Sequence, residues 1–210
     1  MNKYKLTNET TTVGNKTLYR IQALEDFGNV KAGELGGFVE KEANLSQEGN
    51  AWVYGNAMVY DNALVTGNAR VEDNASVYGN AMLFDNACVY DTVKVYDHAK
   101  VYGNAEVSGN AIIYGNATVY GNASVFGNTE VYDNAMLFDN ATVYSNASVF
   151  GNAKVFGIAE VYDDAKVHGN AEVFDCAEVF GDTMLLGRTL VSNDTKLSGN
   201  GMLFDDIKVR

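Results

Sequence analysis

The chain has 210 residues, no proline, two cysteines and a formal net charge of −12. This acidic balance excludes a basic stripe for phosphates, so we expect no direct binding to nucleic acid. No apolar run reaches membrane-spanning length and the N-terminus has no apolar signal-peptide core, so we expect no membrane contact and a cytoplasmic location. Cys88 and Cys176 lie nearly five coils apart in the repeat described below, too far for a disulfide.

Residues 1–29 do not follow the period of the remaining chain and are predicted to form a capping unit. Residues 4–6 and 18–21 have the composition of two short strands around a polar turn that contains Gly14 and Asn15. A hairpin here would cover the unpaired edge of the first coil, which solenoids need. It would also fix the register of a repeat whose neighbouring coils are nearly interchangeable.

Residues 30–210 are predicted to form a repeat array. From Val53 to Val209 every sixth residue is valine, leucine or isoleucine, and a small residue follows four positions after most of them. Alternation along a strand puts both inside the coil, and the Gly-Asn or Asp-Asn pair between them becomes a corner. Glycine and asparagine are expected to supply the positive φ of that corner. Three sides close a triangle, which predicts about nine coils and a length of roughly 43 Å.

This pattern resembles that of hexapeptide-repeat proteins. The resemblance implies an all-β fold: a left-handed parallel β-helix, or triangular hexapeptide-repeat solenoid, with a small N-terminal β-hairpin cap. More specific motifs are D-F-x-x-V-K-A-G at 26–33, G-G-F-V at 36–39 and L-S-Q-x-G-x-x-W at 45–52. They resemble the start of bacterial and prophage proteins of the YdcK-like group, which is named for acyl transfer. An acyl-CoA-dependent acyltransferase is therefore one candidate function.

The two histidines are the candidates for such chemistry, because acyltransferases that this repeat resembles use a histidine as general base beside a loop that leaves the coil. His98 occupies a corner next to Asp97, and His168 occupies an outward position. The unbroken period leaves no room for a pocket-forming loop, so we favour a tolerated corner substitution at His98 and expect no catalytic residue. Two separate histidines and two distant cysteines cannot supply a zinc site, and no metal or other cofactor is expected.

Outward aromatic residues recur every third repeat and predict stacked ladders on two sides, one from Tyr60 to Phe150 and one from Phe84 to Phe174. A long apolar face also suits association. The residues expected to contact protein on the second side are Met82, Phe84, Met136, Phe138, Phe156 and Phe174.

Carboxylates one coil apart are mostly avoided along the corners, which fits like-charge repulsion. Five carboxylates break this rule: Glu160, Asp163, Asp164, Glu178 and Asp182. They predict a docking point for a basic protein surface or a cation, with a solvated acidic patch as the alternative.

The function predicted from these features is that of a non-catalytic β-solenoid that binds protein. A phage- or prophage-encoded inhibitor of a host or defence protein is one specific form of this prediction. The acyltransferase and a purely structural rod or assembly element are the alternatives. We also expect a homo-oligomer, formed through the outward apolar residues or the C-terminal coil.

Overall fold

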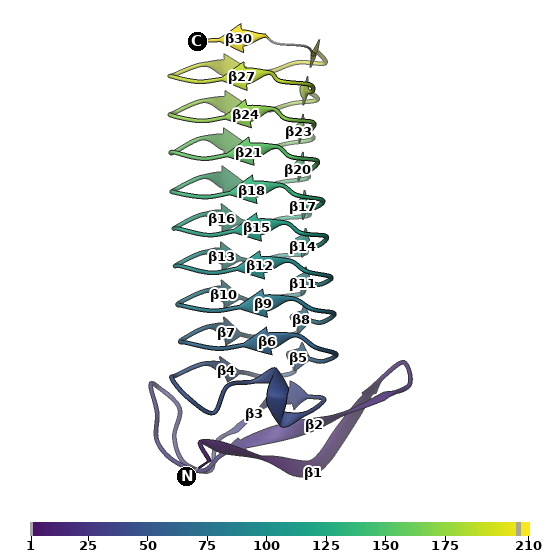
Figure 1. The fold of residues 1–210 in the computed structure, drawn as a ribbon, viewed down its shortest axis with the longest axis vertical. Coiled ribbons are helices and arrows are strands. Elements are labelled where there is room, and N and C mark those ends of the chain that lie inside the picture. The colour runs from purple at the N-terminus through teal and green to yellow at the C-terminus, as the bar shows by residue number, and fades with distance from the viewer. Residues whose placement is uncertain (1, 205–206) are drawn as a thin grey trace.

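The computed structural model describes residues 2–204 and 207–210, which form a three-sided stack of coils on an N-terminal cap (Figure 1). Every strand of the stack after the cap is two residues long and pairs in parallel with the strand 18 residues away, as Val101 does with Val119. The predicted parallel β-solenoid is confirmed, although its strands are shorter than the four residues expected for each side. No helix in the described part of the chain is long and apolar enough to span a membrane.

Three sheets run along the stack. The first continues from the cap through β5 (Met58–Val59), β8 (Ser76–Val77), β11 (Lys94–Val95), β14 (Ile112–Ile113), β17 (Glu130–Val131), β20 (Ser148–Val149), β23 (Lys166–Val167), β26 (Met184–Leu185) and β29 (Met202–Leu203). The second contains β6 (Leu64–Val65), β9 (Met82–Leu83), β12 (Lys100–Val101), β15 (Thr118–Val119), β18 (Met136–Leu137), β21 (Lys154–Val155), β24 (Glu172–Val173), β27 (Leu190–Val191) and β30 (Lys208–Val209). The third contains β4 (Trp52–Val53), β7 (Arg70–Val71), β10 (Cys88–Val89), β13 (Glu106–Val107), β16 (Ser124–Val125), β19 (Thr142–Val143), β22 (Glu160–Val161), β25 (Glu178–Val179) and β28 (Lys196–Leu197).

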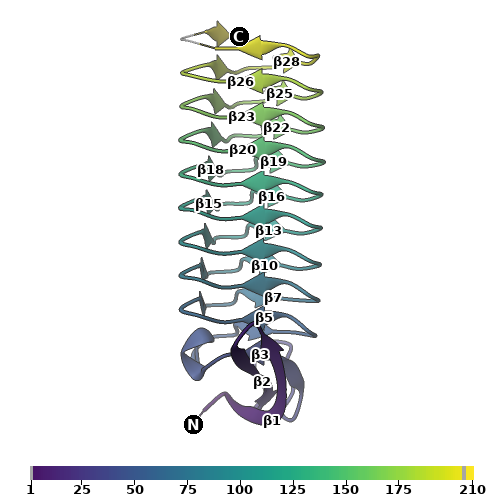
Figure 2. The same cartoon turned by 90° about the vertical axis from the view of Figure 1, so that its right-hand side faces the viewer.

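The cap is the predicted antiparallel hairpin, with longer strands than expected. Strand β1 (Tyr4–Val13) turns at Gly14 into β2 (Lys16–Ala23), and β2 pairs with β3 (Leu35–Val39). Strand β3 then pairs in parallel with β5, so one sheet changes from antiparallel to parallel at this strand. Figure 2 shows β1, β2 and β3 beneath the first coils, although β3 lies in the range 30–210 that was assigned to the array. A single 3₁₀ turn, η1 (Glu42–Asn44), precedes β4.

Aromatic packing holds the cap against the first coil. The buried Trp52 ring packs edge-on against Tyr4, with centroids 6.0 Å apart, and against Phe27, with centroids 5.3 Å apart. The Tyr4 hydroxyl donates to the carbonyl of Leu45 at 2.8 Å, and the Lys3 ammonium donates to the carbonyl of Ala51 at 3.0 Å. The motif residues around positions 27, 45 and 52 therefore form the joint between cap and coil.

The interior follows the predicted pattern, because the valines and alanines of successive coils are fully buried. The corners differ from the prediction. The first corner residue, usually glycine or aspartate, adopts the positive φ, as in Asp97 (φ 57°) and Gly115 (φ 69°). The following asparagine does not, since its side chain serves to join the coils, as described next. Asparagine was expected to supply the positive φ; among the described residues only Asn193, which occupies the first corner position, does so.

Candidate functional site

The corner aspartates hold the next coil through hydrogen bonds. The Asp97 carboxylate accepts the backbone N–H of Gly115 at 3.2 Å, and Asp61 and Asp133 accept Gly79 and Gly151 in the same way. Glycine in the alternate coils fits a close approach, because a Cβ at Gly115 would lie 2.8 Å from the backbone nitrogen of Asp133. The alternation of aspartate and glycine thus has a structural cause besides like-charge repulsion.

Asparagine side chains form an amide ladder along each of the three corners, in which Nδ2 donates to the Oδ1 one coil later, as from Asn104 to Asn122 at 3.0 Å, from Asn110 to Asn128 at 2.9 Å and from Asn134 to Asn152 at 3.2 Å. His98 takes its place in one ladder, where its Nε2 lies 3.3 Å from Nδ2 of Asn80. The carboxylate of its neighbour Asp97 accepts the backbone N–H of Gly115. His168 stacks on Phe150 at a centroid distance of 4.5 Å, and burial together with nearby Lys166 lowers the pKa of His168. Both histidines therefore extend ladders of the coil.

The two predicted aromatic ladders are present, with neighbouring rings nearly parallel and about 5 Å apart, as for Tyr78 and Tyr96 (4.9 Å). Sequence analysis missed a third ladder, formed by Phe126, Tyr144, Tyr162 and Phe180. The six apolar residues expected to contact protein are half-buried: Met82, Phe84, Met136, Phe138, Phe156 and Phe174. Stacking of the rings of neighbouring coils buries part of the surface that we expected to be available to a partner.

The five predicted carboxylates occupy one sheet face and one corner. Glu160 and Glu178 are register neighbours on β22 and β25. The Tyr144 hydroxyl donates to Glu160 at 3.3 Å, and Tyr162 donates to Glu178 at 3.2 Å. Lys196, one coil later, forms an ion pair of 2.7 Å with Glu178 and lowers the pKa of that carboxyl. The sequence showed this lysine in the same column, but we did not include it.

The corner carboxylates are also engaged. Asp163 accepts the backbone N–H of Gly181 at 3.2 Å, and Asp164 accepts the amide of Asn146 at 3.1 Å, while Asp182 is exposed. Over the residues that the structure describes, no three histidine, cysteine, aspartate or glutamate side chains are placed to hold a metal ion. The five residues are thus an acidic surface in which the coil itself engages all but Asp182.

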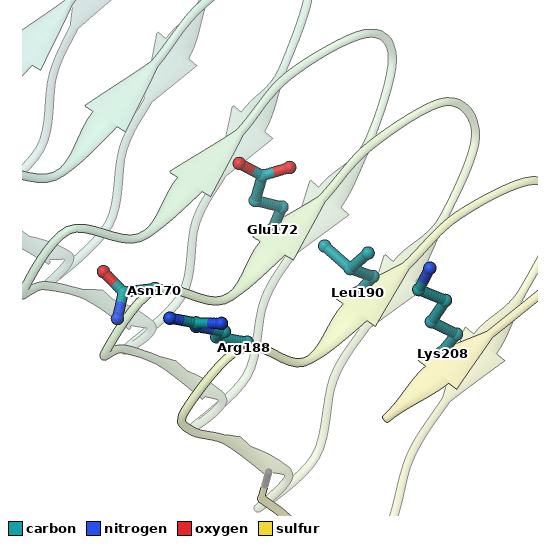
Figure 3. A pocket seen from close by; sticks show the side chains of 5 residues that line it. All are labelled: Asn170, Glu172, Arg188, Leu190 and Lys208. Atoms are coloured by element: carbon teal, nitrogen blue, oxygen red, sulfur yellow. The ribbon is translucent and has the colours of Figure 1, made fainter. Parts of the chain in front are cut away.

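An open groove of about 660 Å³ lies beside β24, β27 and β30 (Figure 3). Asn170 and Arg188 line it from the corner, and Glu172, Leu190 and Lys208 line it from three neighbouring strands. Glu172 forms an ion pair of 2.8 Å with Lys154. The described lining contains no histidine, cysteine, serine or threonine, so this groove brings neither histidine to a position where it could act as a general base.

All three amide ladders end in the same part of the stack, at Asn140, Asn170 and Asp164. Beyond Asn140 the corner carries Ile158 and then Cys176, and both are exposed. These side chains cannot replace the amide hydrogen bonds. The backbone nevertheless stays regular, because the N–H of Ile158 donates to the carbonyl of Asp175 at 2.7 Å. The change is confined to the surface.

Comparison with known proteins agrees with this architecture. A family model described as the YdcK β-solenoid repeat matches residues 51–66 and 111–127. Over 60 residues the chain is 40% identical to a protein of Escherichia coli strain K12 named "Uncharacterized acetyltransferase YdcK". That match covers 25% of this chain and 18% of the relative. The resemblance predicted from the cap motifs and the repeat is confirmed.

Proposed function

We propose that this chain, which is a YdcK-like β-solenoid protein, is a binding module that recognises another protein through the surface of its coils between Ile158 and Arg188. The observation that carries the proposal is that none of the three amide ladders continues through these coils: they end at Asn140, Asp164 and Asn170. Each lost side-chain hydrogen bond gives up stabilisation of about 0.5–1.5 kcal/mol, less at an exposed corner. Residues that break a repeat without a gain in the fold are typical of functional surfaces.

The charge of this surface favours a basic partner. Glu160, Asp164 and Asp182 lie outside the ion pair that Lys196 forms with Glu178. Carboxylates on a rigid surface steer a basic protein into contact and raise its association rate. Inhibition of a host or defence protein would be one use of such binding. Self-association is a separate prediction, which light scattering over a wide range of concentration tests.

The test is capture of a partner from bacterial lysate on the immobilised chain, with excess soluble chain as competitor. The chain is compared with the double variant Asp164→Asn with Asp182→Asn. It restores the asparagine of the repeat and removes two charges. We expect a protein that the soluble chain displaces and that the double variant binds more weakly, with salt weakening the wild-type complex. Capture that is absent, or equal for both baits, would contradict the proposal.

Acyl transfer is the second candidate, because the relative from Escherichia coli carries an acetyltransferase name. The match covers too little of that relative to transfer an activity, and the groove lining contains no histidine, with its carboxylate Glu172 held in an ion pair with Lys154. Calorimetric titration with acetyl-CoA separates the two functions. Saturable binding would favour the transferase, whereas we expect no heat of binding.

A further inference from the structure

The corner formed by Ile158 and Cys176 is apolar in a column that carries asparagine from Asn50 to Asn140 and aspartate at Asp194. Ile158 is 56% exposed, and Cys176 on the next coil is exposed as well. Phe156 and Phe174 precede them by two residues and stack at a centroid distance of 5.0 Å. We call these four residues the Ile158 corner. It presents an apolar centre on a rigid backbone, which suits a side chain of a partner protein.

Carboxylates surround the Ile158 corner. Asp175 lies on the corner itself, Glu160 follows Ile158 by two residues, and Asp194 stands one coil beyond Cys176. Desolvation, followed by the nearby carboxylate of Asp194, raises the pKa of the Cys176 thiol. The rim is therefore negative immediately next to the apolar centre.

This rim argues against a second copy of the chain as the occupant. A two-fold dimer joins the same patch on both subunits, so it would bring the carboxylates of one rim against those of the other. Like charges in contact oppose association, and the chain as a whole carries −12. A partner with basic residues around its apolar side chain would instead place cations against these carboxylates.

We infer, on the basis of the proposed binding function, that the Ile158 corner docks a protein segment whose apolar side chain is flanked by lysine or arginine. The apolar side chain covers Ile158 and Cys176, and the cations face Glu160, Asp175 and Asp194. Because the corner interrupts an amide ladder, the consensus asparagines can be restored there without disturbing the coil.

The probe is a fluorescent ten-residue peptide with a central leucine pair flanked by lysines, and its counterpart has glutamates in place of lysines. Anisotropy titrations use the wild-type chain and the double variant Ile158→Asn with Cys176→Asn. The matched control, Asn86→Ala with Asn104→Ala, changes the same corner several coils away. We expect saturable binding of the lysine peptide alone, a dissociation constant at least about tenfold higher for the double variant, and no change for the control.

Thermal unfolding keeps the result interpretable, because the double variant regains the ladder from Asn140 and should melt no lower than the wild type. Alkylation gives a second readout: bound lysine peptide should slow modification of Cys176, with buried Cys88 as the internal reference. Equal affinity of wild type and double variant, or an unprotected Cys176, would overturn the inference. So would a wild-type dimer that the double variant loses. A partner captured from lysate alongside any of these results would leave the proposed function standing.

Discussion

Substitutions of Asp97 separate two contributions of a corner residue to the stability of the fold: its side-chain hydrogen bond to the next coil and its tolerance of a positive φ. Its carboxylate accepts the N–H of Gly115 at 3.2 Å, and its backbone has φ 57°, a conformation that costs alanine about 1 kcal/mol but asparagine and glycine little. The exposed hydrogen bond contributes about 1 kcal/mol. We therefore expect destabilisation of about 2 kcal/mol for Asp97→Ala, about 1 for Asp97→Gly and a few tenths for Asp97→Asn, which retains an acceptor.

Urea unfolding followed by circular dichroism measures the order of the three variants, and amide hydrogen exchange reports on Gly115 directly. Exchange at Gly115 should accelerate in the glycine and alanine variants and remain slow in the asparagine variant. Equal stability of Asp97→Ala and Asp97→Gly would show that the positive φ carries no cost. Unchanged exchange in all three would refute the hydrogen bond to the next coil.

Three further predictions concern the buried interior, the aromatic ladders and His98. Val119→Asp places a charge in the fully buried stack and should unfold the protein, since burial without a partner costs several kcal/mol; a soluble variant with an unchanged melting temperature would contradict the inward assignment. Burial raises the pKa of Tyr78 to about 12, so the neutral phenol favours the folded state and its contribution to stability is lost as pH rises from about 10 to about 12. Tyr78→Phe should flatten that part of the stability profile, and a profile identical to that of the wild type would count against the shift. His98→Ala should lose the contact with Asn80 and little stability, and any acyl transfer that disappears with it would restore His98 as a catalytic candidate.

The sequence predicted the inside of the coil because a period of six allows one consistent assignment of inward residues. The corners could not be assigned in this way. Glycine, aspartate and asparagine all tolerate positive φ. Contacts between coils decide where a side chain fits at the first corner position, such as the 2.8 Å between a Cβ at Gly115 and the backbone nitrogen of Asp133. A pattern within one repeat contains no information about that approach.

Some features of the candidate surface could have been predicted from the sequence but were not. The third aromatic ladder has the same spacing as the other two, but Glu72 and Ser108 interrupt the earlier part of its column. Lys196 follows Glu160 and Glu178 at the same spacing and forms an ion pair with Glu178. The change from asparagine to Ile158 was visible as well. Its meaning depends on the amide ladder, and no rule for single residues predicts that ladder.

Because every coil pairs with the next in the same way, the number of coils, and with it the length of the stack, can change without a change in the pairing. Inserting or deleting one coil of residues would give each valine and each corner amide an equivalent partner, as the register of β12 with β15 shows. The distance between the cap and the Ile158 corner would change by about 4.8 Å for each coil, while both ends kept their local structure. Separation between the two ends is therefore a property that duplication of a short segment can alter in fixed steps, independently of what either end contacts.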